Sequence, residues 1–228
     1  MFAVKEIFKS VQGEGSRVGY PTIFVRFAGC NLWSGLENLR DKGIGHCALW
    51  CDTDFVKGTK MSLDELVEAM EKEVSNGPLK MVVFSGGEPT LQLKRDAGYE
   101  LVQKLFEMDW WICVETNGTH GFEECPILEV IHNHPRGHIT MSPKPLKADL
   151  SSVEHLKLRK GTDLKVVVPT PFPIEDFLKD FEYEHYFFQP LDTQDGSKGV
   201  TSVDHAIQLC EQYGWRLSCQ THKFLDLP

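Results

Sequence analysis

The chain has 228 residues, 41% of them hydrophobic and 25% charged, and its formal net charge is −9. This length suits one domain over residues 1–228 with a full core, and the negative charge argues against a protein that grips a phosphate backbone. No apolar run approaches the ~20 residues that span a bilayer, and the N-terminus lacks the features of a secretion signal. We therefore expect a cytoplasmic protein that contacts neither nucleic acid nor membrane directly.

Strands and helices are predicted to alternate along the chain. Strand patterns occupy residues 22–27, 81–84, 111–115, 138–142, 164–168, 185–189 and 215–219. Helical patterns occupy residues 62–74, 99–106, 175–181 and 203–213. Ser62 and Glu65 form a capping box at the start of the first of these helices. The alternation predicts an α/β fold with a parallel sheet and right-handed crossovers.

Polar residues follow four of the predicted strands, at positions 85–89, 115–118, 142–144 and 189–192. Each cluster alone is typical of a turn. The carboxyl ends of parallel strands meet at one edge of the sheet, which is where α/β proteins bind their ligands. Four such clusters together therefore predict a shared binding site.

Cys30, Cys47 and Cys51 lie between the first predicted strand and the first predicted helix. In a reducing compartment they are candidate metal ligands rather than disulfide partners. Three thiolates can hold a [4Fe–4S] cluster and leave one iron open to a small molecule. The spacing alone fits a zinc site equally well, with a further ligand from His46, His132, His134 or His138. Free thiols without a metal are the third alternative.

The other cysteines are predicted to be structural, namely Cys113, Cys125, Cys210 and Cys219. Cys113 alternates within a predicted strand, which is typical of a core thiol. The histidines at positions 132, 134 and 138 flank a predicted loop at 135–137. We expect these three histidines to be solvated rather than to bind a metal.

A series of motifs resembles the 7-carboxy-7-deazaguanine synthases, a family of the radical S-adenosylmethionine superfamily that acts in queuosine and deazapurine biosynthesis. The motifs are Gln12-Gly13-Glu14-Gly15, Arg26, Cys30, Cys51-Asp52-Thr53, Gly86-Gly87-Glu88-Pro89, Glu115-Thr116-Asn117-Gly118 and Ser142-Pro143-Lys144. The motif at 86–89 alone indicates only the superfamily, whereas the order and spacing after Cys51 indicate the family. The resemblance covers nearly the whole chain and implies a partial (β/α)6-type barrel around the parallel sheet.

The cysteine spacing departs from the usual superfamily pattern of three and then two intervening residues. Here sixteen residues separate Cys30 from Cys47, and three separate Cys47 from Cys51. The insertion at 31–46 resembles the extended cluster loop of some family members, so the cluster loop is expected to span residues 30–51.

The resemblance implies where the cofactors bind. Cys30, Cys47 and Cys51 would hold the [4Fe–4S] cluster, and S-adenosylmethionine would chelate its open iron. The residues implied for the S-adenosylmethionine site are Trp50, Cys51, Asp52, Gly87, Glu88, Glu115, Asn117, Ser142, Pro143, Lys144, Gln189, Pro190, Leu191 and Asp192.

The resemblance also implies a pterin site formed by Val11, Gln12, Gly13, Glu14, Arg26, Ser85 and the C-terminal Pro228. Arg26 suits the substrate carboxylate because a guanidinium group binds carboxylates in a bidentate manner. Thr53 is expected to give an oxygen ligand to a Mg²⁺ ion that the substrate shares. Residues 221–228 are expected to fold back over the site.

The implied reaction begins with a 5′-deoxyadenosyl radical from S-adenosylmethionine, which abstracts hydrogen from C6 of 6-carboxy-5,6,7,8-tetrahydropterin. The six-membered ring contracts, ammonia leaves, and 7-carboxy-7-deazaguanine results. No side chain is expected to be catalytic beyond the cofactor-bound radical. An external one-electron reductant of the flavodoxin or ferredoxin type and a homodimer are also implied.

Two other functions share part of the pattern. A radical S-adenosylmethionine activase, which makes a glycyl radical on a partner protein, would carry the same cluster and the same motif at 86–89. The motif at 12–15 and Arg26 favour a small substrate instead. A zinc-stabilised binding module without catalysis would use the cysteines alone, and the four polar strand ends argue against it.

Overall fold

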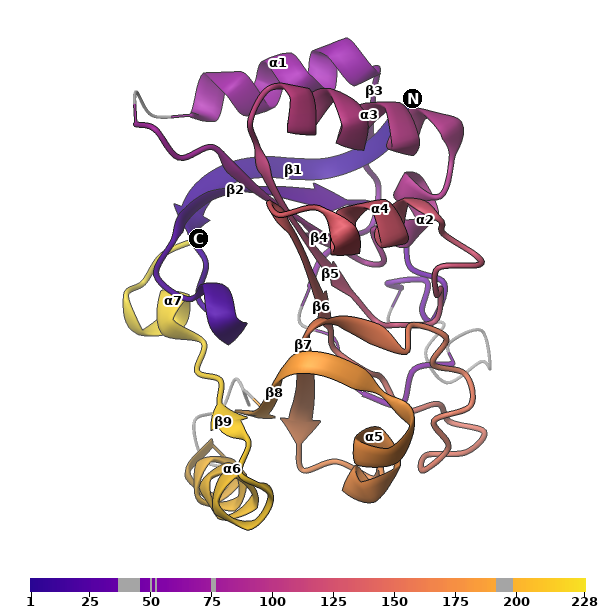
Figure 1. The fold of residues 1–228 in the computed structure, drawn as a ribbon, viewed down its shortest axis with the longest axis vertical. Coiled ribbons are helices and arrows are strands. Elements are labelled where there is room, and N and C mark those ends of the chain that lie inside the picture. The colour runs from indigo at the N-terminus through magenta and orange to yellow at the C-terminus, as the bar shows by residue number, and fades with distance from the viewer. Residues whose placement is uncertain (37–45, 50, 52, 75–76, 192–198) are drawn as a thin grey trace.

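The computed structural model describes residues 1–228 apart from 37–45, 50, 52, 75–76 and 192–198 (Figure 1). Its strands form a curved sheet in the order β3-β1-β2-β4-β5-β6-β7-β8-β9. The strands are β1 (Phe2–Val11), β2 (Pro21–Phe27), β3 (Thr59–Met61), β4 (Met81–Gly86), β5 (Trp111–Thr116), β6 (Gly137–Met141), β7 (Lys160–Val168), β8 (Glu182–Pro190) and β9 (Arg216–Leu217). From β2 to β9 neighbouring strands are parallel, whereas β1 pairs antiparallel with β2 and β3. The predicted α/β fold with a parallel sheet is confirmed.

The helices are η1 (Gly15–Arg17), α1 (Leu63–Glu73), α2 (Thr90–Leu93), α3 (Asp96–Glu107), α4 (Ile127–Asn133), α5 (Ile174–Asp180), α6 (Gly199–Tyr213) and α7 (Thr221–Phe224). Figure 1 shows α1, α3 and α4 along the outer side of the curved sheet, while η1 and α7 lie beside the opening of its inner side. This arrangement leaves the concave face free to form a site and agrees with a partial barrel.

The capping box predicted for α1 is confirmed. The Ser62 hydroxyl accepts from the Glu65 amide at 3.2 Å, and the Ser62 amide donates to the Glu65 carboxylate at 2.7 Å. Two of the amides left without a partner at a helix start are thereby satisfied. The helix then turns Leu66 and Met70, both fully buried, toward the sheet.

Alternation along the central strands gives an apolar outer face and an inner face that carries a small apolar cluster around Val83 and becomes polar toward the carboxyl ends. In β4, Val82 and Phe84 are fully buried in the same cluster as Leu101 and Leu105 of α3. Each such side chain contributes about 1.5–3 kcal/mol when it leaves water. Side chains on a strand alternate in direction, so Ser85 turns to the opposite face, where it borders the inner cavity. The outer face therefore stabilises the sheet, and the inner face carries polar groups.

The sequence-based prediction did not include β1, β3, η1, α2, α4 and α7. The N-terminal strand β1 has only two apolar positions that are fully packed at its start, Phe2 and Val4, and much of the rest is half-exposed. The short helix α4 packs Ile127, Leu128 and Ile131 inward over only seven residues. Neither segment has a long, regular pattern of hydrophobic residues in its sequence. Each is held mainly by tertiary packing, which the local sequence does not reveal.

Two expectations about single residues were wrong. His138 is not solvated: it is 2% exposed on β6, and its Nε2 lies 3.2 Å from Oδ2 of Asp163. Cys219 is exposed rather than built into the core. Cys113, on β5, and Cys125, two residues before the start of α4, are both buried.

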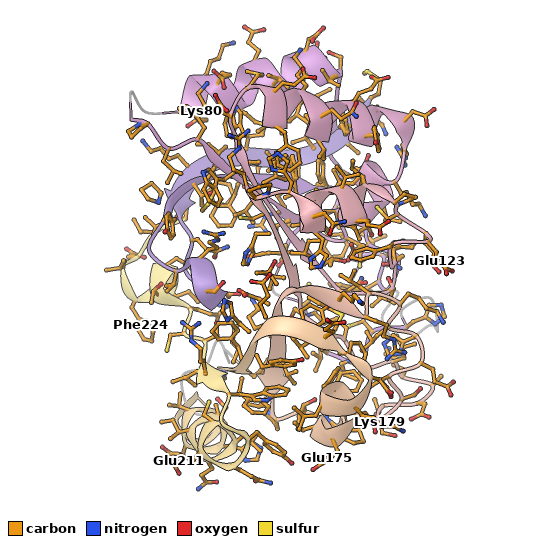
Figure 2. All side chains as sticks on the ribbon, in the orientation of Figure 1. Lys80, Glu123, Glu175, Lys179, Glu211 and Phe224 are labelled. Atoms are coloured by element: carbon orange, nitrogen blue, oxygen red, sulfur yellow. The ribbon has the colours of Figure 1, made fainter. Side chains whose placement is uncertain are left out.

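Charged side chains cover the outer surface. Glu175, Lys179 and Glu211 point away from the sheet (Figure 2). Within the part of the chain that the structure describes, none of the helices combines the length and the apolar character that a membrane crossing needs.

Candidate active site

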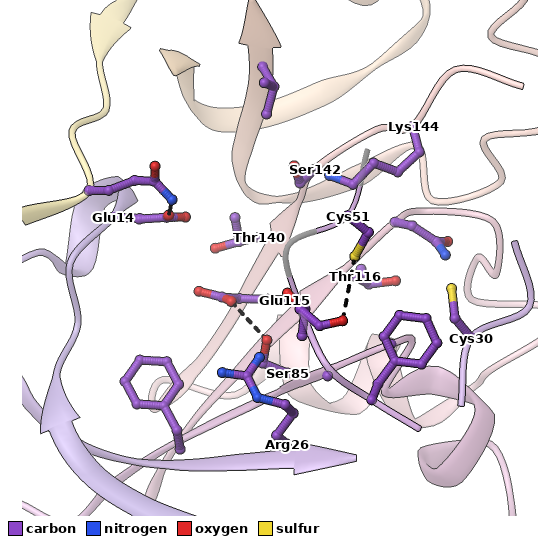
Figure 3. Close-up of a pocket in the computed structure, with 18 of the residues that line it drawn as sticks. Glu14, Arg26, Cys30, Cys51, Ser85, Glu115, Thr116, Thr140, Ser142 and Lys144 are labelled. Carbon is purple, nitrogen blue, oxygen red and sulfur yellow. Dashed lines mark hydrogen bonds between the residues drawn. The ribbon is translucent and has the colours of Figure 1, made fainter. Parts of the chain in front are cut away.

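A cavity of about 1050 Å³ opens on the inner face of the sheet, at the carboxyl ends of the parallel strands (Figure 3). Four residues at these strand ends line the cavity. Ser85 lies in β4, Glu115 in β5 and Gln189 in β8, and Ser142 comes directly after β6. The four polar strand ends therefore meet in one site, as their positions predict. The volume suits more than one small molecule.

The turn at 12–15 is fixed to the sheet by hydrogen bonds. Gln12 Nε2 donates to Oε1 of Glu115 at 3.0 Å, and Ser85 Oγ donates to Oε2 of the same carboxylate at 3.2 Å. Gly15 has a φ of +66°, and a Cβ there would lie 2.5 Å from Asp163. Only glycine accepts this conformation and this close approach.

Glu14 lies in this turn and meets three donors. The Lys165 ammonium group contacts its Oε2, while the amides of Gln189 and Gln220 donate to its Oε1 at 3.2 and 2.9 Å. Lys165 was not among the predicted site residues, although it lines the cavity from β7. A lysine within the apolar run 164–168 was the available signal.

Arg26 also lines the cavity but does not pair with Glu14. Its Nε lies 2.6 Å from Oε1 of Glu6, and its guanidinium carbon lies 5.8 Å from the centre of the Phe8 ring. Glu6 is half-exposed, so this ion pair contributes little stability. The guanidinium group can therefore exchange this partner for a ligand carboxylate at low cost.

The three cysteines of the predicted cluster loop border the same cavity, and Figure 3 shows Cys30 and Cys51 on the side away from Glu14. Burial raises the pKa of the Cys30 thiol to about 11, although the amides of Leu32 and Trp33 act in the opposite direction. His46 is exposed and outside the cavity wall. The other four cysteines also lie outside the wall, so the loop alone supplies thiols to the site.

Two metal centres, a zinc ion and a [4Fe–4S] cluster, place different demands on the cysteines that line the cavity. Among the described residues, no three His, Cys, Asp or Glu side chains approach closely enough to hold a single metal ion. A zinc ion needs its ligands around one point, whereas each cysteine of a [4Fe–4S] cluster binds a different iron. The three cysteine thiols that line one cavity match the donor set of a [4Fe–4S] cluster with one open iron.

Most residues expected around S-adenosylmethionine also line the cavity, namely Cys51, Gly87, Glu115, Asn117, Ser142, Lys144, Gln189, Pro190 and Leu191. A Cβ at Gly87 would lie 2.1 Å from the Gly29 carbonyl oxygen, so only glycine fits there. Pro143 is buried behind the wall. Trp50, Asp52 and Asp192 lie outside the described residues.

Glu88 lies behind the cavity wall. It is fully buried, and its carboxylate accepts from the Thr90 hydroxyl at 2.6 Å, the Thr116 hydroxyl at 2.7 Å and the Asn117 amide at 2.8 Å. These contacts join the end of β4 to the end of β5. In this structure Glu88 holds the neighbouring strand end in place and is not part of the cavity surface.

The C-terminal segment reaches the turn at 12–15. The Thr221 amide donates to the Gly13 carbonyl at 3.0 Å, and Ser10 Oγ donates to the Pro228 carbonyl at 2.7 Å. Pro228 and Thr53 both line the cavity, whereas Val11 and Gly13 support it from outside the wall. The segment at 221–228 therefore lies beside the site.

The model of the Radical SAM superfamily matches residues 34–165. The chain is 39% identical over 236 residues to the 7-carboxy-7-deazaguanine synthase of Burkholderia multivorans, covering 100% of this chain and 99% of that protein. It is 36% identical over 237 residues to the enzyme of that name from Caulobacter vibrioides, with the same coverage.

The crystal structure of QueE from Escherichia coli resembles the fold with a TM-score of 0.62 and 23% identity, covering 96% of this chain and 93% of that one. Such a likeness supports the arrangement of the sheet alone. The full-length identities and the superfamily match show that the chain belongs to the 7-carboxy-7-deazaguanine synthase family of the radical S-adenosylmethionine superfamily.

Proposed function

We propose that this protein converts 6-carboxy-5,6,7,8-tetrahydropterin to 7-carboxy-7-deazaguanine with loss of ammonia, a step toward queuosine or another deazapurine. The observation that carries the proposal is a single cavity with the cysteine thiols on one side and the turn bearing Glu14 on the other. A radical source and its target have to be held together in one cavity for hydrogen abstraction to be efficient.

Members of the radical S-adenosylmethionine superfamily use a [4Fe–4S] cluster and S-adenosylmethionine. When bound, these two groups supply a 5′-deoxyadenosyl radical. Cys30, Cys47 and Cys51 would hold the cluster, and the absence of a side chain at Gly87 lets the chain there pack closely against Gly29 and Cys30. Asn117 and Lys144 offer polar contacts on the same wall. The protein's own contribution is to position the reacting carbon and to exclude water.

The pterin would bind at the opposite side of the cavity. Arg26 is the partner proposed for its carboxylate, and Glu14 the acceptor for N–H groups of its aminopyrimidinone ring. Thr53 would provide an oxygen to a Mg²⁺ ion that also contacts substrate and water. Pro228, which lines the cavity, would complete the substrate site.

The proposed function also implies a domain organisation, an electron donor, an assembly and a cellular location. We expect all 228 residues to act as one unit, with the segment at 221–228 limiting access of water to the cavity. A flavodoxin- or ferredoxin-type protein would deliver the electron, and a homodimer is the expected assembly. A cytoplasmic location would keep the cluster cysteines reduced.

The test is an anaerobic assay of the reconstituted protein with the carboxytetrahydropterin, S-adenosylmethionine, Mg²⁺ and a reductant. Appearance of the 7-carboxy-7-deazaguanine chromophore supports the proposal. A brown protein that cleaves S-adenosylmethionine but leaves the pterin unchanged would overturn it, and a colourless zinc protein would overturn the cluster as well.

A further inference from the structure

Lys165 is a buried lysine in the cavity wall that the proposed reaction leaves without a role. It is 5% exposed, and it lies on β7 between Leu164 and Val166, which pack into the core on the other face. Its ammonium group contacts the Glu14 carboxylate. Taking a lysine out of water is costly, so its position in the wall needs a reason.

The ammonium group of Lys165 has more N–H donors than the described residues use. A lysine carries three N–H donors, and among the described residues only Glu14 accepts from it. Burial lowers the pKa of Lys165 to about 7, while the adjacent carboxylate favours the charged form. Two donors therefore remain for an acceptor in the cavity, where an unmet donor is unfavourable.

Glu14 has acceptor capacity beside these donors. An ionised carboxylate offers about four lone-pair sites, and Lys165, Gln189 and Gln220 occupy three of them. Among the described residues no donor occupies the fourth site, and a ligand N–H could also take the place of the Gln220 amide. The side-chain oxygen of Gln189 is already used, since it accepts from the Ser218 hydroxyl at 3.1 Å.

We propose that Lys165 is a specificity-determining residue that donates to the 4-oxo group of the pterin, next to the N–H groups that Glu14 accepts. This inference rests on the proposed function. A 2-amino-4-oxo ring presents two donors and an acceptor along one edge, and an adjacent carboxylate and ammonium group are complementary to that order. A ring with an amino group at position 4 presents a donor to Lys165 and an unprotonated N3 to Glu14, and it is rejected.

The test is anaerobic binding to the cluster-loaded protein without reductant, so that no turnover occurs. The ligands are the carboxytetrahydropterin and its 4-amino analogue. The wild-type protein should prefer the 4-oxo ligand by roughly 10- to 100-fold, the range for loss of a charged hydrogen bond. Lys165→Met should weaken the 4-oxo ligand by this factor and leave the 4-amino ligand bound no more weakly than before.

Two further variants serve as controls, one for the charge left on Glu14 and one for the loss of a lysine outside the cavity. Lys165→Met combined with Glu14→Gln removes both charges, so no unpaired carboxylate is left buried, and it should also lose the preference. Lys160→Met, on the same strand but with a side chain 57% exposed, should keep it. Equal binding of both ligands by the wild-type protein, or an undiminished preference in the two Lys165 variants, overturns the inference. Failure of the wild-type protein to bind or convert the pterin overturns the proposed function itself.

Discussion

At the scale of single residues, the three cysteines of one loop are the proposed ligands of the [4Fe–4S] cluster. Replacing Cys30, Cys47 or Cys51 singly with Ala should abolish the bound [4Fe–4S] cluster, because each thiolate binds a separate iron. The iron content and the visible absorption of reconstituted protein measure this. Cys113→Ala and Cys219→Ala are the controls, one buried and one exposed, and both should keep the cluster. A Cys47→Ala protein with a full cluster would show that another residue is the ligand.

Arg26 is the residue on which recognition of the substrate carboxylate depends in this account. Arg26→Ala should weaken pterin binding by about 1.5–3 kcal/mol, the contribution of a hydrogen bond to a charged group, and should raise KM or abolish turnover. Cleavage of S-adenosylmethionine without pterin should continue, since the cluster loop lies elsewhere in the cavity. Glu6→Ala removes only the present partner of Arg26 and should leave KM nearly unchanged.

If Arg26→Ala turns over the pterin with unchanged KM, the guanidinium group belongs to the scaffold.

Glu88 is predicted to act through the residues that it holds. Glu88→Ala would leave the Thr116 hydroxyl and the Asn117 amide without an acceptor in a fully buried place. The free energy of unfolding of the cluster-free protein should fall by about 3 kcal/mol, as measured by denaturant titration. Glu73→Ala, at the exposed end of α1, should change it by less than about 0.5 kcal/mol. Equal loss in the two variants would mean that Glu88 has no such structural role.

At the scale of elements, Asp163 of β7 connects η1 to the sheet. Its carboxylate accepts from the Ser16 amide and hydroxyl, each at 2.8 Å, and lies 3.2 Å from His138 of β6. Burial alone would raise the pKa of Asp163, but the hydrogen bonds from His138 and Ser16 outweigh it and hold the pKa below the usual value. The turn that carries Glu14 is thus attached through a charged group.

A carboxyl group with a lowered folded-state pKa stabilises the fold above its unfolded-state pKa, and this stabilisation is lost as the pH falls through the folded-state value. Asp163→Asn should therefore lower the free energy of unfolding by about 2 kcal/mol near neutral pH. The difference from wild type should shrink below about pH 4, as measured by denaturant titration at several pH values. A difference that stays constant down to acid pH would show that the charge of Asp163 does not contribute.

The elements that the sequence predicts well are those with a long local pattern. Both α1, with its capping box, and the apolar strands β4 to β8 were expected within a few residues. The strand β1 and the helix α4 were missed because their stability comes from neighbours distant in sequence. The same reason explains the missed contacts of Glu14, whose partners Lys165 and Gln220 follow it by 151 and 206 residues.

At the scale of the whole molecule, the site could be anticipated because parallel strands bring their carboxyl ends together. The polar clusters at the ends of β4, β5, β6 and β8 were enough to predict one shared cavity. Which of its residues point inward was not predictable: Glu88 belongs to the motif at 86–89 yet lies behind the wall, and His138 lies buried in β6. Motifs indicate the chemistry, whereas side-chain direction depends on the packing of the sheet.

The measurement that tests the central claim most directly uses 6-carboxy-5,6,7,8-tetrahydropterin labelled with deuterium at C6. The reduced, cluster-loaded protein is incubated anaerobically with this substrate and S-adenosylmethionine, and the 5′-deoxyadenosine formed is analysed by mass spectrometry. The account predicts that deuterium from C6 appears in 5′-deoxyadenosine as 7-carboxy-7-deazaguanine accumulates. Formation of the product together with deuterium-free 5′-deoxyadenosine would contradict it.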